Sequence, residues 1–186
     1  MTLKEMYIEI ARRVEEDIVI KDNQKISDST QAILDKFLIS INYAYRKIAL
    51  DKRLFLTKEQ VTLENNRVNT DYLNEEFGEI LKVTDSEGNN LKYFWEDGDN
   101  EILVEGTGLA DVTVYYYYLP RRLEEMQDEP QFPADVDDMI LCFFAAYDYL
   151  AQEGDEEAKA QNQLILYNDK YDSIRRRRGR TKYVKQ

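Results

Sequence analysis

The chain has 186 residues, of which 43% are hydrophobic and 33% charged, a balance typical of a folded protein with a hydrophobic core. It has no histidine and a single cysteine, which excludes catalytic triads, Cys–His pairs, His-ligated metal sites and intrachain disulfides. The formal net charge is −12, but residues 173–186 hold seven basic residues and no acidic one, so residues 1–172 carry −19. An acidic body with a basic tail is informative about partners rather than about fold.

Targeting and cofactor signals are weak throughout the sequence. No apolar run approaches the about 20 residues needed to span a membrane, and the segment MTLKEMYIEIARRVEED is too charged for a signal peptide. Neither GxxxxGK[ST] nor GxGxxG occurs, so no phosphate-cradling loop is expected. Cys142 lies in an apolar stretch, which favours a buried structural thiol in a reducing cytosol.

Two helices are predicted before residue 53. Thr2 and Glu5 match a capping box that opens a helix over residues 2–19, with an apolar side made of Met6, Ile10, Val14 and Ile18. Asp28 or Ser29 can cap a second helix that ends near Lys52. Its stripe follows helical spacing through Ile33, Leu34, Phe37, Leu38, Ile41, Tyr45 and Ile48.

From Leu54 to Pro120 the hydrophobic period changes from 3.6 to 2, which predicts short strands. The turns between them are rich in Gly, Asn and Asp. The expected strands are 61–63, 68–72, 80–84, 91–95, 101–105 and 112–119. The last is the clearest, since DVTVYYYY is β-branched and aromatic and Pro120 stops it. The spacing of these strands indicates a small antiparallel sandwich or curled sheet.

A strongly apolar helix is predicted over residues 136–150, and the rest of the fold must pack around it. Asp135, Asp137 and Asp138 crowd its expected first turn, and Gly154 suits its C-cap. A last helix is expected from Asp155 to Arg178, with an apolar side made of Ala158, Leu164, Ile165, Tyr167, Tyr171 and Ile174.

These elements predict an α+β fold in which a four-helix layer carries a small antiparallel β-domain inserted between helices 2 and 3. The expected boundaries are 1–53 and 132–178 for the helical core, 54–121 for the inserted β-domain and 179–186 for the basic C-terminal tail. The connection PRRLEEMQDEPQFP is polar and leads back into the helical layer.

In this order and spacing the chain resembles the head–tail adaptor (connector) proteins of tailed bacteriophages. A helical pair precedes a β-insert that contains VTLENNRVNTDYLNEEFGEILKVTDSEGNNLKYFW and closes with VTVYYYYLPRRL. A segment beginning PADVDDMILCFFAAYDYLAQEG then resembles the Pro-Asp helix, Ala-rich middle and acidic turn of that family. The resemblance covers nearly the whole chain and includes no catalytic fingerprint.

The resemblance implies a structural protein of the virion, located at the head–tail junction and in the host cytoplasm during assembly. Such adaptors form a homo-oligomeric ring, usually of twelve copies, beneath the portal protein, and they dock tail or stopper proteins. Packaged DNA passes through the ring without sequence-specific binding, and an acidic lining would let it slide. No membrane partner, enzymatic activity, cofactor, metal or catalytic residue is expected.

The basic tail is the first candidate site. Docking on the portal would use Arg175, Arg176, Arg177, Arg178, Arg180, Lys182 and Tyr183. A basic helix end that only complements the helix dipole, or a phosphate-binding Arg run, would account for the same residues.

The tyrosine run is the second candidate. Tyr115, Tyr116, Tyr117 and Tyr118 alternate across one strand, so we expect them in the core or at a subunit interface. Base stacking is the alternative, and we find it less favoured because no basic residue neighbours the run in the sequence.

The acidic clusters have simpler explanations. Glu96, Asp97, Gly98 and Asp99 supply only part of a calcium loop, and turn chemistry suffices for them.

Two other functions stay open: a carbohydrate- or protein-binding module that uses the β-domain, and a nucleic-acid-binding regulator that uses the tail, against which the charge of −19 argues.

Overall fold

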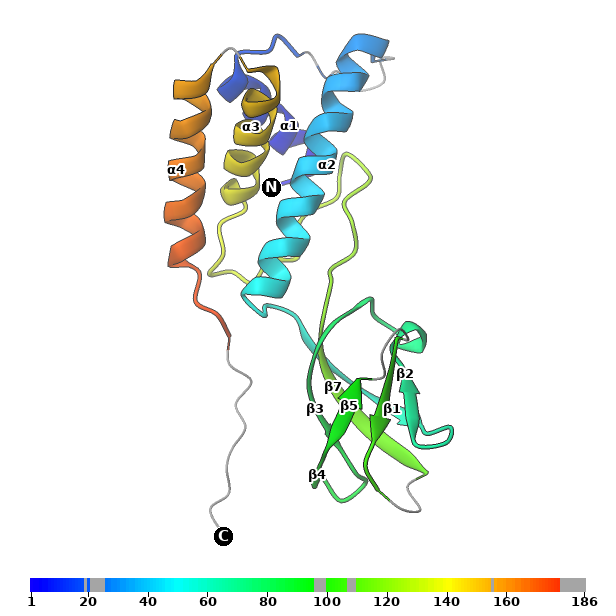
Figure 1. Ribbon diagram of the computed structural model, residues 1–186. Helices are drawn as coiled ribbons and strands as arrows, with labels where there is room; N and C mark the ends of the chain where they lie inside the picture. Colours follow the sequence, from blue (N-terminus) through cyan, green and yellow to red (C-terminus); the bar gives the residue numbers. More distant parts are fainter. Residues whose placement is uncertain (19, 21–25, 96–99, 107–109, 155, 178–186) are drawn as a thin grey trace. The chain divides into compact units, whose positions relative to one another are not determined.

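The computed structural model describes residues 1–18, 20, 26–95, 100–106, 110–154 and 156–177. Its described part is α+β, with helices at both ends of the chain and antiparallel strands between α2 and α3 (Figure 1). The chain divides into two compact units. The helical unit contains residues 1–48 and 122–175, and the β-unit contains residues 49–121 with Arg176 and Arg177.

The helical unit is built from α1 (Leu3–Val14), α2 (Asp28–Asp51, up to Ile48), α3 (Met139–Glu153) and α4 (Glu157–Ser173). Helices α3 and α4 lie side by side, and α1 packs on α3 (Figure 1). The capping box at Thr2 and Glu5 is present, and Gly154 ends α3 in the left-handed conformation at φ 79°. Within the described residues, no helix has the length and apolar character to cross a membrane.

Several predicted helix ends were wrong by a few residues. Helix α1 stops at Val14 because Glu15 takes a left-handed conformation at φ 59°, so Ile18 lies beyond the helix. Ser27, rather than Asp28 or Ser29, caps α2, since its hydroxyl accepts the Thr30 N–H at 3.2 Å. The other shifts are at α3, which begins at Met139, and at α4, which ends at Ser173, before the arginine run.

The core of the helical unit is filled by large side chains from three helices. Leu34, Phe37 and Ile41 of α2 are buried as the sequence stripe predicts. The ring of Phe37 meets that of Tyr149 of α3 edge-on, with centroids 5.2 Å apart. Helix α3 is buried almost all round, as expected for the central helix.

The connection after residue 121 packs as part of this unit. The side chain of Asn42 both donates to the carbonyl of Leu123 at 2.9 Å and accepts its N–H at 2.8 Å. The hydroxyl of Tyr45 accepts the Gln131 N–H at 2.8 Å, and the Phe132 ring stands edge-on to the Tyr45 ring. A segment without helix or strand is therefore ordered by side chains of α2 that satisfy its backbone.

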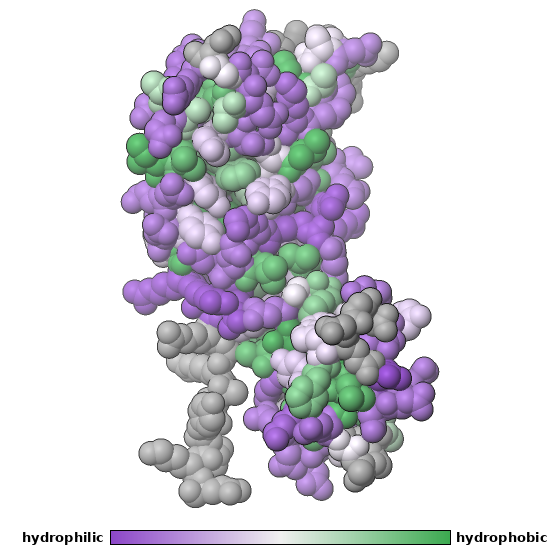
Figure 2. Space-filling model, in the orientation of Figure 1, coloured by the Kyte–Doolittle hydropathy of each residue, from purple (hydrophilic) through white to green (hydrophobic). Residues whose placement is uncertain are grey.

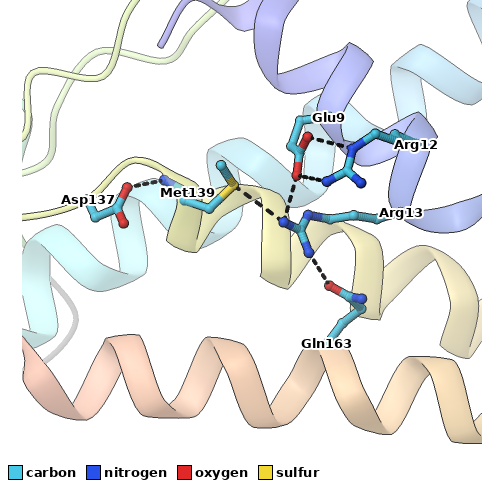
Figure 3. A network of polar contacts seen from close by, with 6 residues as sticks. All are labelled: Glu9, Arg12, Arg13, Asp137, Met139 and Gln163. Carbon is cyan, nitrogen blue, oxygen red and sulfur yellow. Dashed lines mark hydrogen bonds and ion pairs between the residues drawn. The ribbon is translucent and has the colours of Figure 1, made fainter.

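An arginine on α1 joins three helices (Figure 3). The guanidinium of Arg13 pairs with Glu9 at 2.6 Å, reaches the Gln163 side chain of α4 at 3.3 Å and the sulfur of Met139 of α3 at 3.8 Å. It also lies over the ring of Phe143, 4.4 Å from the centroid. Arg13 and Glu9 are only 16% and 18% exposed, so this is a largely desolvated ion pair within the core.

The β-unit holds two antiparallel sheets. The strands are β1 (Leu56–Thr62), β2 (Arg67–Asn69), β3 (Phe77–Thr84), β4 (Asn90–Leu91), β5 (Tyr93–Trp95), β6 (Glu101–Val104) and β7 (Asp111–Tyr118). One sheet has the order β1-β7-β3-β4 and the other β2-β6-β5. Residues 70–72, expected to continue a strand, form a 3-10 turn capped by the Asn69 side chain. The chain changes sheets between β1 and β2, β2 and β3, β4 and β5, and β6 and β7.

The two sheets share one core, as a sandwich does. Val68, Ile102 and Val104 of the smaller sheet pack with Val83, Val112, Val114 and Tyr116 of the larger one. Strand β7 is central in its sheet, which explains why the sequence marks it so strongly. Strand β1 begins at Leu56 and is longer than predicted. Its outward residues are exposed and its inward residues are only half-buried, so its sequence lacks the alternation of apolar and polar residues by which a strand is predicted.

Candidate interaction surface

An apolar surface, here called the aromatic face, crosses three helices of the helical unit. It consists of Ile39, Tyr43, Phe144, Tyr147, Tyr167 and Tyr171. The Tyr43 ring of α2 lies 5.6 Å from the Phe144 ring of α3, which lies 5.2 Å from Tyr167 of α4. In Figure 2, green and pale side chains interrupt the purple surface of this unit.

The exposed members of the aromatic face lie on α2. Ile39 is 71% exposed and Tyr43, one turn further along, is 57% exposed. The stripe that α2 turns into the core is complete without them, since Phe37, Ile41 and Ala44 are fully buried. Helix α2 is thus apolar on a second side that the unit itself leaves uncovered, and contiguous exposed apolar surface of this kind marks interaction sites.

A hollow of about 280 Å³ adjoins the aromatic face at the turn between α3 and α4. Its lining is Tyr147, Leu150, Ala151, Gly154, Glu157, Ala160 and Gln161. Most of these residues are small or apolar, while Glu157 and Gln161 supply polar groups from α4.

The basic tail is described only at its start. Arg175, Arg176 and Arg177 are exposed, and the backbone N–H of Arg177 donates to the Lys52 carbonyl at 2.8 Å. The three arginines lie beyond the end of α4 at Ser173, so they do not belong to the last turn of that helix. The other predicted portal contacts, Arg178, Arg180, Lys182 and Tyr183, lie outside the described residues.

The four consecutive tyrosines separate into two kinds. Tyr116 and Tyr117 are buried, at 0% and 1% exposure, while Tyr115 and Tyr118 are half-buried. The hydroxyl of Tyr116 donates to the Glu59 carboxylate at 3.2 Å and accepts the Glu75 N–H at 3.3 Å, and burial raises the pKa of its phenol to about 12. Tyr116 and Tyr117 are therefore buried within the chain itself.

The idea that no basic residue neighbours the tyrosines was wrong in three dimensions. The ammonium of Lys82 lies 4.3 Å from the centroid of the Tyr115 ring, and the guanidinium of Arg53 lies 5.3 Å from that of Tyr117. The pairing of β3 with β7 places Lys82 opposite Tyr115, and Arg53, which precedes β1, pairs with Glu79 of β3, the residue opposite Tyr117. That pairing is not visible in the sequence.

The aspartates before α3 bind other parts of the helical unit and do not form the first turn of α3. Asp137 accepts the Met139 N–H at 3.0 Å and pairs with Lys170 of α4 at 2.8 Å. The Lys170 hydrogen bond is the main reason why the pKa of Asp137 is lowered.

Among the described residues, no group of three or more Cys, Asp or Glu side chains is arranged to hold a metal. Residues 96–99, discussed above for calcium, lie outside the described residues.

Cys142 lies at the centre of α3 and is fully buried. Burial raises the pKa of its thiol to about 12, so the group is protonated at neutral pH. A protonated thiol with no access to solvent cannot act as a nucleophile, and its contribution is packing.

The sequence was compared with protein-family models and with curated proteins, and neither comparison gives a match.

Proposed function

We propose that this chain is a non-enzymatic, ring-forming head–tail adaptor of a tailed phage or prophage, located at the head–tail junction of the virion. The observation that carries the proposal is the aromatic face, an apolar surface on an acidic protein. The order helix pair, β-unit, helix pair agrees with the resemblance seen in the sequence. The partners are further copies of the chain, the portal protein and tail or stopper proteins.

The aromatic face has the size that a subunit contact needs. Taking about 150–250 Å² for a whole large side chain, the exposed parts of Ile39 and Tyr43, 71% and 57%, already amount to roughly 200–300 Å², and the half-buried rings of Phe144, Tyr147 and Tyr171 add to this area. A standard interface buries about 800 Å² per partner, of which about 57% is non-polar, or roughly 450 Å². The face is therefore comparable with the apolar part of one complete interface.

The occupant that we propose for this face is a second copy of the chain. Two copies that each carry a net charge of −12 repel one another wherever charged surfaces meet. The six residues of the aromatic face include no charged side chain, so contact there buries apolar area without bringing carboxylates together. The adjoining hollow of about 280 Å³ offers a place for a side chain of the neighbouring copy.

The test is light scattering after size exclusion, with the protein alone and then mixed with the portal protein encoded beside it. We expect a ring, formed either alone or only on the portal. A chain that stays monomeric and ignores the portal at micromolar concentration would overturn the proposal.

Matched variants locate the contact. The double substitution Ile39→Ser/Tyr43→Ser removes the two most exposed members of the aromatic face and should give monomers. Tyr72→Ser is the control, because Tyr72 is 84% exposed on the β-unit and the substitution removes a comparable aromatic side chain. Equal assembly by both variants would show that the aromatic face is not the subunit contact.

The two alternatives from the sequence have their own tests. A carbohydrate-binding module needs a shared aromatic platform, yet Phe94 and Trp95, each about half exposed, are neighbours on β5 and point to opposite faces. Ligand protection of Trp95 fluorescence would nevertheless support a binding module. A tail-based regulator would be retained on DNA in a salt-sensitive way that depends on the tail arginines.

A further inference from the structure

The outward face of the larger sheet carries an aromatic ring between two lysines. Tyr115 of the central strand β7 is paired in register with Lys58 of β1 on one side and with Lys82 of β3 on the other. Residues directly across an antiparallel sheet point to the same face, so all three side chains lie on the side away from the core. Lys58 is exposed, and Lys82 and Tyr115 are half-buried.

The next row of the same face is uncharged and polar. Thr113 of β7 lies between Gln60 of β1 and Thr84 of β3, and of these Gln60 is exposed, Thr113 is half-buried and Thr84 is buried. Gln60 and Thr113 therefore add hydrogen-bonding groups in the row next to the Tyr115 ring. This combination differs from the aromatic face of the helical unit, which has no charged member.

The carboxylates on this face are already engaged. Glu79 forms an ion pair with Arg53, and Asp111 accepts a hydrogen bond from the Thr62 hydroxyl at 2.7 Å. Lys58 and Lys82, by contrast, form no ion pair with any carboxylate in the described ranges. In a chain of net charge −12, two unneutralised ammonium groups beside one tyrosine form a local positive site.

We propose that this face binds single-stranded nucleic acid without sequence preference, with a base stacked on Tyr115 and backbone phosphates held by Lys58 and Lys82. Strands β1 and β3 flank β7, so their backbones lie about 10 Å apart, two inter-strand spacings, and both lysines reach a strand that crosses the sheet. Stacking on an aromatic ring is tolerant of base identity, and the lysines supply the phosphate attraction.

The present position of Lys82 is compatible with this mode. Its ammonium lies over the Tyr115 ring at 4.3 Å, held by a cation–π contact that is weak at exposed sites. A base that stacks on Tyr115 takes the place of this ammonium, which then turns toward the neighbouring phosphate. An acidic peptide would satisfy the lysines but would leave the ring without a flat partner, so nucleic acid fits all three residues better.

This inference does not rest on ring formation or on the basic tail. All three residues belong to the β-unit of one chain, and the subunit contact proposed above lies on the helical unit. The two proposals therefore fail independently: a protein that assembles without binding oligonucleotide overturns only this one.

The test is fluorescence anisotropy with a labelled 20-nucleotide poly(dT) strand and the full chain at low salt. The double substitution Lys58→Gln/Lys82→Gln should weaken binding at least 10-fold and make the salt dependence shallower by about 1.4 in log K against log[salt], since each lost phosphate contact removes about 0.7. The control is Lys36→Gln/Lys92→Gln, which changes the net charge equally at two other exposed lysines and should alter binding less than 2-fold.

A second variant separates stacking from simple charge attraction. Tyr115→Leu should lower affinity for the single strand about 10-fold and leave affinity for a duplex of the same length unchanged. Circular dichroism and Trp95 fluorescence check that the β-unit is folded in each variant.

Several outcomes would overturn the inference. Absence of binding up to 100 μM protein in low salt would do so, as would equal losses in the sheet double variant and its control. Binding that disappears when Arg175 and Arg176 are replaced by Gln, but survives the sheet substitutions, would assign it to the tail instead. If polyphosphate competes as well as poly(dT) and Tyr115→Leu has no effect, the face is only a site for anions.

Discussion

Arg13 and Arg12 are neighbours on α1 that share one partner, Glu9, yet they should differ widely in their contribution to stability. The side chain of Arg12 is 68% exposed, whereas that of Arg13 is 16% exposed among α1, α3 and α4. We therefore predict that Arg13→Met destabilises the helical unit by about 2–3 kcal/mol and that Arg12→Met, which removes a solvent-screened ion pair, destabilises it far less.

The magnitude for Arg13 follows from its contacts. Losing a charge-assisted hydrogen bond to Glu9 costs about 1.5–3 kcal/mol, and losing the desolvated cation–π contact with Phe143 costs about 1–2 kcal/mol. The Nε atom of Arg13 is buried without a hydrogen-bond partner, and removing it returns about 1–2 kcal/mol. Methionine keeps most of the volume, so no large cavity adds to the total.

The assay is thermal unfolding, with urea unfolding beside it, followed by circular dichroism at 222 nm, which reports mainly on the helices. For a chain of this size, 1 kcal/mol corresponds to about 2–4 °C in Tm, so Arg13→Met should melt about 4–12 °C lower than the wild type. A double-mutant cycle with Glu9→Gln should show a coupling of at least about 1 kcal/mol for Arg13 and a smaller one for Arg12, whose hydrogen bonds to Glu9 are screened by solvent. Equal unfolding midpoints for Arg12→Met and Arg13→Met would refute the reasoning that burial of the arginine, and not its partner Glu9, determines how much stability is lost.

Three further predictions concern other parts of the molecule. Gly78→Ala should lower the stability of the β-unit by about 1–3 kcal/mol in unfolding followed by Trp95 fluorescence, because its Cβ would lie 2.8 Å from the Tyr117 carbonyl oxygen; an unchanged midpoint would contradict this. Cys142 should stay unmodified by a disulfide reagent at pH 8 in the folded protein and react promptly in guanidinium, whereas fast labelling of the folded chain would show that α3 is not buried as described. The Arg12 hydrogen bond is the main reason why the pKa of Glu9 lies below its ordinary value of 4.5, so its stabilising effect is present above that pH and is lost as the pH falls through the lowered value. The stability difference between wild type and Glu9→Gln should accordingly shrink between pH 5 and strongly acidic pH, and a difference that grows on acidification would reverse the sign of the argument.

The features of the fold that depend on local sequence were predictable. The capping box of Thr2 and Glu5, the buried stripe of α2 and the Gly154 cap each involve residues within a few positions of one another. Strand β7 was predictable because its residues favour a central strand on their own. In each case the physical cause lies in the segment itself.

The features that depend on pairing between distant segments were not predictable. Tyr115 stands between Lys58 and Lys82 only because β7 pairs with both β1 and β3, and neither register can be derived from one sequence. Helical spacing also placed Ile165 on the inner side of α4, yet it is 57% exposed, because Ala160 and Tyr167 define the side that meets α3. The burial of Arg13 likewise depends on α3 and α4 closing over it.

The first and last strands of the β-unit are hydrogen-bonded neighbours, with Leu56 opposite Tyr117 and Thr62 opposite Asp111. The chain therefore enters and leaves this unit at adjacent points, so the unit is a cassette within a helical gene product. A cassette with neighbouring ends can be gained, lost or exchanged by recombination without moving the helices that flank it. For protein engineering, a short linker in place of residues 56–118 is the natural first design for a minimal helical form of the protein, and a foreign domain with neighbouring termini is the natural first graft.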